Sequence, residues 1–315
     1  MSVNIARTAD GWWVERGGRL VPIDTRASTT RELLADREAI DRAVEHGSEG
    51  PLAKDVVLVS PVTAPARVVA QMVNYRSHAI DSGFDPDAVP PTFFRKASGS
   101  VTGPTDDIVC PPHVGFLDYE IELGVVLGRR LEIGDVVTAE NLGEYVAGLV
   151  ITNDVSARDI QLTRTQFYES KSYPTFTPVG PYLALVSGDE LADLNALRLK
   201  LTVNGEVRQN STVAEMIVRP AEALTLLARF QILDAGDLVL TGTPGGTALK
   251  APPKVVEKIA ALLPPAVKWR AFFSRQASNP RYLHHGDVVT ATIGRPDGAV
   301  DLGTQVNTVR SGGLR

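Results

Sequence analysis

Residues 117–124 read LDYEIELG, an alternation of acidic and apolar side chains that predicts a β-strand. Side chains in a strand point to opposite faces in turn, so Asp118, Glu120 and Glu122 share one face while the residues between them face a core. Like charges this close repel one another unless a positive group lies between them. A second run, just after an apolar stretch, carries another carboxylate at Asp154. Together the two runs predict a site for a hard divalent cation.

An acidic strand face also has an ordinary explanation, which is exposure to solvent. The spacing of Glu120 and Glu122 alone leaves the two interpretations about even. The flanking apolar runs are typical of a buried sheet, however, and burying carboxylates without partners is costly. Because the chain has no cluster of cysteine and histidine residues, oxygen ligands favour Mg²⁺, Mn²⁺ or Ca²⁺ over zinc. An octahedral ion bound by Glu120, Glu122 and Asp154 would keep its other positions for water or a chelating substrate.

The composition limits the class of protein. With 315 residues and 43% hydrophobic content, the chain can bury a large core. A net charge of -5 gives no basic stripe, which argues against nucleic acid as a partner. The single cysteine, Cys110, excludes an internal disulfide framework and fits a reducing compartment. The chain start lacks a signal-peptide layout, and no apolar run is long enough to span a bilayer, so we expect a cytoplasmic protein without membrane contact.

The positions of turn residues and prolines along the chain predict two domains. Short strands broken by glycine-containing turns predict a small sheet in residues 3–24. Thr29 and Glu32 have the spacing of a capping box, and one amphipathic helix should follow them. Prolines then mark a boundary between a small N-terminal α+β domain and a large domain, residues 1–65 and 66–315.

The large domain is strand-rich, and the chain as a whole is predicted to be mixed α/β. The predicted strands are apolar or alternating runs between turn residues, at 68–73, 121–127, 146–151, 197–203, 238–240 and 288–293. Asn204-Gly205 is a strong hairpin signal, and Pro220 suits the first turn of a helix. Residues 247–282 are irregular and carry a basic and aromatic patch. They predict a lid or a subunit contact, or equally a long surface loop with one short helix.

His78 follows a predicted strand, where a short helical turn begins. The i, i+3 spacing places Asp81 beside it, so that the carboxylate would orient the imidazole and raise its basicity. This arrangement predicts a general-base dyad. A histidine hydrogen-bonded at a helix start is the ordinary alternative, favoured about two to one for a lone histidine.

Lys171 opens a run rich in proline and glycine, residues 171–181, that predicts an irregular loop. A lysine in such a loop is usually solvated. Its functional interpretation is that the cation balances the carboxylates and helps to hold an anionic substrate or a developing oxyanion. Arg158 and Gln161, one helical turn apart, would bind a substrate carboxylate or carbonyl, or would simply cap the turn. The residues alone leave these roles equally weighted.

Residues 240–246 read LTGTPGG and look like a phosphate-binding loop. They have neither the lysine of a P-loop nor the spacing of a dinucleotide fingerprint. A tight turn that presents Thr243 and backbone N–H groups to a ligand fits better. The sequence has no Gly-x-Ser-x-Gly elbow, and Cys110 has no base at a suitable spacing, so water is the expected nucleophile.

Five motifs resemble, in their order along the chain, those of the fumarylacetoacetate hydrolase family. They are Asn74-Tyr75-x-x-His78, Asp118-Tyr119-Glu120-x-Glu122-Leu123, residues 153–161 (NDVSARDIQ), Lys171 with Phe176-x-Pro178-x-Gly180-Pro181, and Thr241-Gly242-Thr243-Pro244. The resemblance covers roughly residues 65–310, and the N-terminal unit resembles the small domain of many bacterial members. Five motifs in the right order make the resemblance far more specific than any one of them.

The resemblance implies a mixed β-roll fold, usually in a homodimer. It implies Mg²⁺ or Mn²⁺ bound by Glu120, Glu122 and Asp154, with a 1,3-dioxo or 2-oxo acid chelating the ion through two oxygens. His78 and Asp81 would deprotonate a water that attacks the carbonyl remote from the metal. Cleavage of the carbon–carbon bond would leave an enolate, whose charge the ion and a lysine stabilise. That lysine matches Lys171, and the positions of substrate contact or support match Arg158, Gln161, Thr243 and Tyr75.

The leading hypothesis from the sequence is a metal-dependent hydrolase that cleaves a carbon–carbon bond of an acylpyruvate-like or β-diketo acid. An oxo-acid decarboxylase or a keto–enol isomerase is the alternative, because the same enolate can form without attack by water. A non-catalytic dimeric binding protein is a third hypothesis. The complete set of acids, with His78 and Lys171, argues against it, since a scaffold has no use for all of them.

Overall fold

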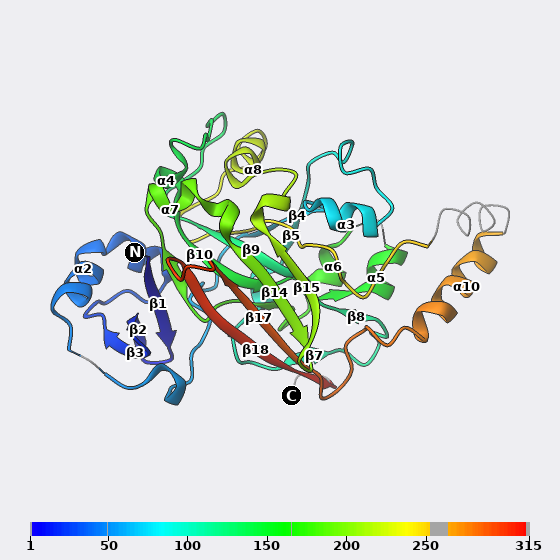
Figure 1. The fold of residues 1–315 in the computed structure, drawn as a ribbon, viewed down its shortest axis with the longest axis horizontal. Coiled ribbons are helices and arrows are strands. Elements are labelled where there is room, and N and C mark those ends of the chain that lie inside the picture. Colours follow the sequence, from blue (N-terminus) through cyan, green and yellow to red (C-terminus); the bar gives the residue numbers. More distant parts are fainter. Residues whose placement is uncertain (1, 49, 165, 253–263, 313–315) are drawn as a thin grey trace.

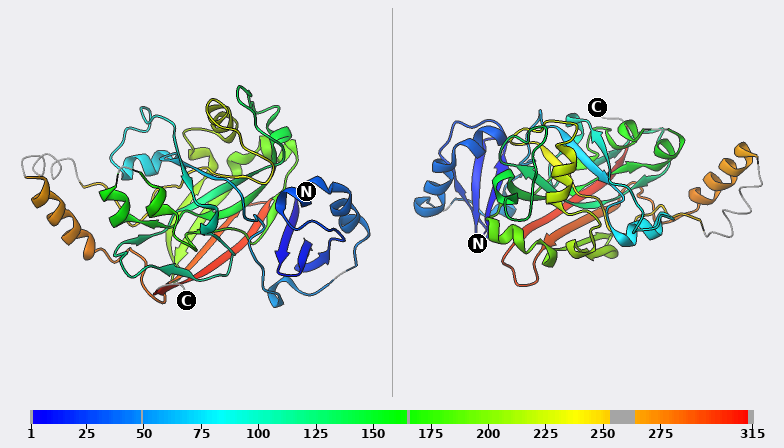
Figure 2. Two further views of the ribbon diagram at one scale, coloured as in Figure 1. Left: turned by 180° about the vertical axis from the view of Figure 1, so that it is seen from behind. Right: turned by 90° about the horizontal axis from the view of Figure 1, so that it is seen from above.

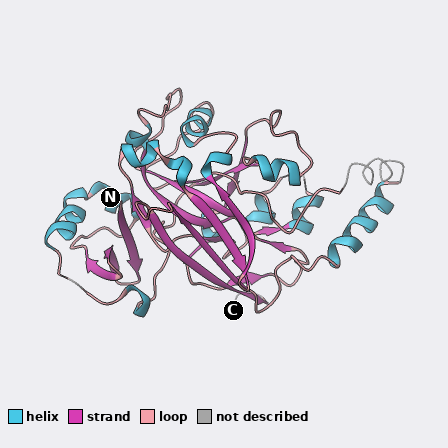
Figure 3. Cartoon of the chain, viewed as in Figure 1, coloured by secondary structure: helices cyan, strands magenta, loops and turns pink. Residues whose placement is uncertain are grey.

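The computed structural model describes residues 2–48, 50–164, 166–252 and 264–312. Over these residues the chain forms one nine-stranded sheet, one five-stranded sheet and two short two-stranded sheets, with helices around them (Figures 1 and 3). This confirms the predicted mixed α/β, strand-rich class. None of the helices in the described ranges combines the length and the apolar character that crossing a membrane requires.

The nine-stranded sheet contains the strands that carry the acidic residues. Its strands, in spatial order, are β3 (Arg19–Pro22), β2 (Gly11–Arg16), β1 (Val3–Thr8), β13 (Leu183–Leu185), β10 (Val146–Asn153), β9 (Ile121–Leu127), β16 (Leu238–Leu240), β4 (Val68–Met72) and β5 (Thr92–Lys96). All neighbours are antiparallel except β16 and β4. The predicted bounds of β9 and β16 are therefore confirmed, and those of β4 and β10 differ by one or two residues.

The five-stranded sheet comes mainly from the C-terminal half of the chain. Its order is β15 (Glu206–Thr212), β14 (Arg198–Val203), β17 (Val288–Gly294), β18 (Asp301–Ser311) and β7 (Ile108–Cys110). Asn204 and Gly205 join β14 to β15 with φ of 52° and 82°, the left-handed conformation that a two-residue hairpin turn needs. The hairpin predicted from these two residues is confirmed. The two-stranded sheets pair β11 (Ser156–Ala157) with β8 (Leu117–Asp118) and β12 (Thr177–Pro178) with β6 (Val101–Thr102).

The central strand β9 is buried on both faces because it lies between two hydrophobic clusters. Leu123 and Val125 point into the larger cluster, which they share with Leu199 and Ala291 of the five-stranded sheet. Val126 points the other way, into a cluster that includes residues of the N-terminal segment. Both faces of its N-terminal end, where the acids lie, are therefore enclosed by protein.

The N-terminal segment does not form a separate sheet, which corrects the expectation of a small opening sheet. β1 pairs with β13 in the register Val3 with Leu185 and Ile5 with Leu183, so β1–β3 extend the large sheet. Ile5 and Val21 also share a hydrophobic cluster with Val126 of β9. The sheet and the hydrophobic core continue across residue 65. The domain boundary there stays a prediction.

The helices lie mostly at the ends and edges of the sheets (Figure 3). They are α1 (Thr30–Ala35), α2 (Arg37–His46), α3 (Arg76–Asp81), α4 (Leu142–Tyr145), α5 (Arg158–Thr163), α6 (Tyr168–Lys171), α7 (Gly188–Ala192), α8 (Pro220–Leu227) and α10 (Pro265–Ala277). The capping box of Thr29 and Glu32 is present, but the chain bends at Asp36 and makes two helices where one is predicted. Pro220 occupies the first turn of α8, as predicted.

The irregular segment near the C-terminus contains a helix of 13 residues, α10, which is longer than the short helix considered from the sequence. In Figure 2, α10 extends from the body at the end opposite the N-terminal strands. Residues 253–263, part of the predicted lid or contact segment, lie outside the described residues.

Candidate functional site

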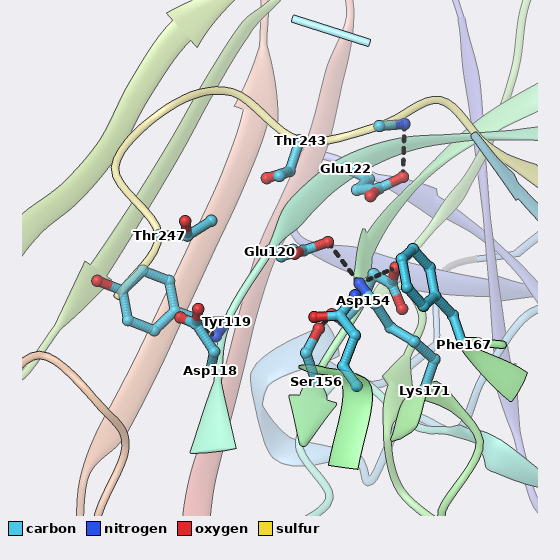
Figure 4. Close-up of polar contacts among 12 residues, drawn as sticks. Asp118, Tyr119, Glu120, Glu122, Asp154, Ser156, Phe167, Lys171, Thr243 and Thr247 are labelled. Atoms are coloured by element: carbon cyan, nitrogen blue, oxygen red, sulfur yellow. Dashed lines mark hydrogen bonds and ion pairs between the residues drawn. The ribbon is translucent and has the colours of Figure 1, made fainter. Parts of the chain in front are cut away.

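Three acidic side chains converge where β9 and β10 lie side by side (Figure 4). Glu122 is on β9, Glu120 directly precedes β9, and Asp154 directly follows β10. Because the strands are antiparallel, the start of β9 lies beside the end of β10, and Thr152 pairs with Glu122. One carboxylate oxygen from each acid lies within 4.8 Å of the others. The structure thus brings together the three residues predicted as metal ligands.

The strand predicted over residues 117–124 is interrupted. β8 ends at Asp118 and β9 begins only after Glu120. Glu120 is nevertheless fixed, because its N–H donates to Asn153 Oδ1 at 2.9 Å and its carbonyl accepts from Asp154 N–H at 2.8 Å. The position of this acid is therefore fixed by contacts with the end of β10 and not by a regular strand.

Asp118 is predicted on the same face as Glu120, but its carboxylate has other partners. It is fully buried, and it accepts hydrogen bonds from Arg158 Nε at 2.8 Å and from the N–H groups of Ala248 and Leu249 at 2.8 and 3.1 Å. Asp118 therefore connects α5 to the segment that follows the Thr243 turn, and it is not one of the three converging acids.

Lys171 lies among the acids, as its functional interpretation predicts. It is the last residue of α6 rather than part of a loop, and it is 2% exposed rather than solvated. Its Nζ donates to Glu120 Oε2 at 2.8 Å and to Asp154 Oδ2 at 2.7 Å. One ammonium group therefore bridges two of the candidate metal ligands.

Arg158 is a second buried cation at the site. Its Nη2 donates to Glu120 Oε1, and its Nη1 donates to Gln161 Oε1 at 2.8 Å. Together with the bond to Asp118, this makes the guanidinium a fork between two acids. The predicted neighbours Arg158 and Gln161 do meet, but most donors of the arginine are already engaged by protein.

Lys96 is a site residue that the sequence interpretation missed. It ends β5 and is buried, and its Nζ donates to Asp154 and, at 2.9 Å, to the carbonyl of Phe176. The available signal is weak: in the TFFRK run of β5 the two-residue alternation places Lys96 on the same side as Phe94. The contact with Asp154 depends on the fold and not on local sequence.

The two glutamates differ in their electrostatic surroundings. Burial by itself raises the pKa of Glu120, but the charges of Lys171 and Arg158 outweigh it and hold that pKa below its ordinary value. Glu122 has no ion-pair partner among the described residues, and its carboxylate accepts the N–H of Gly242 at 2.6 Å. Burial, together with the charges of Asp154 and Glu120, raises the pKa of Glu122 well above its ordinary value.

The donor set fits a hard divalent cation. When all groups at this site are ionised, its buried acids outnumber its buried cations by one, the acids being Asp118, Glu120, Glu122 and Asp154 and the cations Lys96, Arg158 and Lys171. The uncompensated charge falls on the converging carboxylates, where oxygen ligands suit Mg²⁺ or Mn²⁺. A dication would reverse the local charge and leave the site positive toward an anionic substrate.

The predicted dyad of His78 and Asp81 is not formed in this structure. Asp81 Oδ2 accepts the N–H of Gly246 at 3.0 Å, and its Oδ1 pairs with Lys250 at 3.0 Å. Both carboxylate oxygens are therefore bonded to the loop after the Thr243 turn and not to the imidazole. His78 lies on α3 beside the acids, and its Nδ1 has no hydrogen-bond partner among the described residues. Burial lowers the pKa of His78, so the ring is neutral at pH 7.

The two other predicted substrate contacts have different surroundings. Thr243 lines the cavity above the acids, where its hydroxyl donates to the carbonyl of Ile121 and accepts from Gln209, both at 2.8 Å. Tyr75 is fully buried and is not among the residues described as lining that cavity. The prediction that Tyr75 contacts substrate is therefore not supported by its position.

The acids form the floor of a cavity of about 370 Å³. His78, Arg158, Gln161, Lys171 and Thr243 also line it. The remaining lining is largely apolar and comes from several loops and helices, with Met72, Val73, Phe84, Phe94, Leu162, Phe167, Leu249, Ala251, Pro252 and Phe272. The site therefore combines a charged floor with an apolar wall, a combination typical of small-molecule sites.

Comparisons with known proteins agree with this architecture. The chain is 38% identical over 207 residues to oxaloacetate tautomerase FAHD2A, mitochondrial, of Bos taurus, which covers 65% of this chain and 64% of the relative. It is also 38% identical over 197 residues to 2,4-didehydro-3-deoxy-L-rhamnonate hydrolase of Sphingomonas sp. (strain SKA58), covering 62% of this chain and 67% of the relative. The match thus spans 64% of the length of the bovine relative.

Solved structures with similar folds cover nearly the whole chain. A probable 2-hydroxyhepta-2,4-diene-1,7-dioate isomerase from Mycobacterium abscessus is 28% identical, with a TM-score of 0.75 and 100% of both chains covered. A maleylpyruvate hydrolase from Sphingobium sp. SYK-6, in complex with manganese(II) ion and pyruvate, is 23% identical, with a TM-score of 0.71 and coverage of 99% of this chain and 100% of the other. Residues 67–310 match the family model Fumarylacetoacetate (FAA) hydrolase C-terminal. The chain therefore belongs to the fumarylacetoacetate hydrolase family, whose members include hydrolases, isomerases and tautomerases.

Proposed function

We propose that this protein is a divalent-metal-dependent hydrolase that cleaves a carbon–carbon bond of an acylpyruvate-like 2,4-dioxo acid. The observation that carries the proposal is the convergence of Glu120, Glu122 and Asp154, all buried and within 4.8 Å of one another. Buried carboxylates without enough cations are costly to keep, so such a cluster is best explained by a ligand that neutralises it.

Glu120, Glu122 and Asp154 would hold Mg²⁺ or Mn²⁺, which supplies a Lewis acid to polarise the oxygens of a 2-oxo acid. The side chain of Lys171 reaches the same place with a fixed positive charge. It would attract the substrate carboxylate and stabilise negative charge that develops on the substrate oxygens. Gln161, oriented by Arg158, offers its amide N–H group to a further substrate oxygen.

His78 is the residue that would act as the general base. It is neutral at pH 7 and lines the cavity, so it can accept a proton from water. The hydroxyl group of that water adds to the acyl carbonyl carbon C4. The bond between C3 and C4 then breaks with its electron pair on C3, and C3 takes up the proton. The products are a carboxylic acid and pyruvate, so the atoms of substrate and water are all accounted for.

The cleanest test of this proposal is Glu122→Gln. Replacing Glu120 would also remove one carboxylate partner from both Arg158 and Lys171, whereas Glu122 has no ion-pair partner among the described residues. We expect Glu122→Gln to weaken Mn²⁺ binding by about a hundredfold, with loss of acylpyruvate cleavage, since even changes outside the ligand shell cost 10 to 100-fold. Calorimetric titration with Mn²⁺ and a turnover assay measure both effects. Glu45→Gln, an exposed change on α2, serves as the control. Unchanged Mn²⁺ affinity in Glu122→Gln would contradict the proposal.

Keto–enol isomerisation is a second candidate, and one observation favours it. Asp81 is engaged by Gly246 and Lys250, so His78 lacks the carboxylate that would strengthen it as a base toward water. Moving a proton between carbon and oxygen of an oxo acid makes no such demand, and a relative bears the name oxaloacetate tautomerase. His78→Gln separates the candidates. If the variant loses acylpyruvate cleavage but keeps tautomerisation or decarboxylation of oxaloacetate, isomerisation is favoured. If the wild-type protein has no tautomerase activity and the variant loses acylpyruvate cleavage, hydrolysis is favoured.

A further inference from the structure

Most charged side chains that line the cavity are gathered around the acids. Arg158 pairs with Glu120, and Lys171 pairs with Glu120 and Asp154. The uncharged polar side chains that line the cavity besides Gln161 and Thr243 are Gln71, Ser82 and Thr247. The described lining has one more charged side chain, Lys250, whose ammonium group is paired with Asp81 at 3.0 Å. A substrate whose head lies on the floor therefore has to place its remaining atoms against a largely apolar wall.

Two aromatic rings begin this wall directly beside the charged floor. Phe94 and Phe167 pack edge to face with ring centroids 5.6 Å apart, and the ring of Phe94 lies 5.4 Å from Lys171 Nζ. Figure 4 shows Phe167 next to Asp154 and Lys171. No polar layer separates the substrate head from this part of the wall, so the first atoms beyond the head meet aromatic carbon.

Two leucines continue the wall, and each is fixed to the floor by local structure. Leu162 lies one turn after Arg158 on α5, so one face of this helix presents a charged, an amide and an apolar side chain in succession. Leu249 lies in the segment that Asp118 holds through the N–H groups of Ala248 and Leu249. The apolar wall is therefore positioned by the same residues that organise the charged floor.

A second cavity of about 710 Å³ lies against α10 and shares part of its lining with the first, including Leu162, Pro252 and Phe272. Phe272 packs edge to face on Trp269 with ring centroids 5.9 Å apart. Four cations line this second cavity: Lys250, which also lines the first, and Lys268, Arg275 and Arg281. The apolar wall therefore belongs to the first cavity, and an acyl group short enough to stay there avoids the cations of the second.

We infer that the acyl group of the substrate is neutral and apolar, an alkyl chain or an aryl ring, so that the substrate class is the 2,4-dioxo acids with one carboxylate. This inference rests on the proposed function and adds its specificity. A second carboxylate on a short acyl group would be buried against Phe94, Leu162 and Phe167 without a free cation among the described lining residues, at a large cost. Each methylene group buried there instead favours binding by about threefold to fourfold.

The first experiment is a series of 2,4-dioxo acids assayed with the Mn²⁺-loaded protein. The acyl chain is lengthened from methyl to pentyl, and each member is compared with a chain of equal length that ends in a carboxylate. We expect kcat/KM to rise about threefold per methylene and to fall at least about tenfold when the terminal carboxylate is added. Equal or higher kcat/KM for the dicarboxylates overturns the inference but leaves the proposed hydrolysis intact. No turnover of any member overturns both.

A second experiment introduces a cation into the wall. Leu162→Lys should lower the affinity for the pentyl compound and raise the affinity for its carboxylate-ended counterpart, since the new ammonium group can pair with that carboxylate. Val57→Lys is the matched control, because Val57 is 74% exposed and does not line the cavity. Calorimetric binding of 2-oxo acids with the same side chains, which needs no turnover, gives an independent readout. Affinities that are flat along the series, or the same preference in wild type and Leu162→Lys, would overturn the inference.

Discussion

At the scale of single residues, Lys171 occupies the position between two candidate metal ligands. Its ammonium group is 2.8 Å from Glu120 and 2.7 Å from Asp154, so it neutralises charge that an incoming ion would also neutralise. Lysine and ion therefore compete for the same oxygens in binding, although both would stabilise negative charge on the substrate. The two roles can be separated, because substitution should move them in opposite directions.

Lys171→Met should tighten Mn²⁺ binding by about tenfold while it lowers turnover. The change removes one positive charge next to the ion and keeps most of the side-chain volume, and charges this close interact by several kcal/mol even with partial screening. Calorimetric titration gives the affinity and steady-state kinetics gives kcat. Lys250→Met, on the rim of the same cavity, is the control and should change the Mn²⁺ affinity by less than about twofold. Weaker Mn²⁺ binding in Lys171→Met would show that the lysine supports the ion and does not compete with it.

Some residues of the cavity floor can be predicted from local sequence patterns, and others cannot. Glu120, Glu122 and Asp154 could be predicted because alternation and strand ends are local signals. Lys96 could not, since its contact with Asp154 joins residues that are far apart in sequence. The same limit explains Asp118 and Asp81, whose partners Ala248, Leu249, Gly246 and Lys250 all lie in the loop after the Thr243 turn.

At the scale of elements, patterns that depend on a few neighbouring residues were reliable. The bounds of β9 and β16, the Asn204-Gly205 turn and the proline at the start of α8 follow from periodicity and backbone preferences. The predicted strand across residues 117–124 fails at one point only, where Glu120 bonds to Asn153 at the end of another strand. A long-range contact replaces the hydrogen bonds of a regular strand there, and no local sequence pattern predicts that contact.

The hairpin turn gives a stability prediction at this scale. Gly205→Ala should destabilise the protein by about 1 kcal/mol, because the residue has a φ of 82° that L side chains rarely adopt. A Cβ atom at Gly205 meets nothing within 4 Å, so the loss would come from backbone strain rather than from a clash.

Gly99→Ala is the matched control for the hairpin change. A Cβ atom there also meets nothing within 4 Å, and the φ of Gly99 lies outside the left-handed range. Urea unfolding should show the two variants separated by about 1 kcal/mol, with Gly99→Ala at or above wild type. Equal stability of the two variants would contradict the strain argument.

At the scale of the whole molecule, the N-terminal segment and the family-matching region share one sheet and one hydrophobic cluster. β1 hydrogen-bonds to β13, and residues such as Ile5 and Leu33 share a core with Val126 and Val150. Two domains were predicted because the prolines near residue 65 and the strand-rich sequence after them can be seen in the sequence. The pairing of β1 with β13 in one sheet cannot. The homodimer implied by the family resemblance stays a prediction, for which light scattering is the direct measurement.

The shared core predicts a single cooperative thermal transition for the full chain. Removing residues 1–65 would free the edge of β13 and expose the cluster around Val126 and Val150, so the shortened chain should lose its tertiary structure or aggregate. Scanning calorimetry of the full chain and near-ultraviolet circular dichroism of the shortened chain measure these effects. Two separate transitions, with a shortened chain that keeps its native spectrum, would support the two-domain division instead.

The central claim is that Glu120, Glu122 and Asp154 hold a divalent ion to which an oxo acid binds. The most direct measurement is a crystal structure with Mn²⁺ and oxalate, which mimics the enolate of pyruvate, using anomalous scattering to locate the metal. We expect one anomalous peak at about 2.0 to 2.3 Å from a carboxylate oxygen of each acid, with oxalate chelating the ion and Lys171 shifted from between Glu120 and Asp154. Absence of that peak at saturating Mn²⁺, with Lys171 still bridging the two acids, would contradict the account.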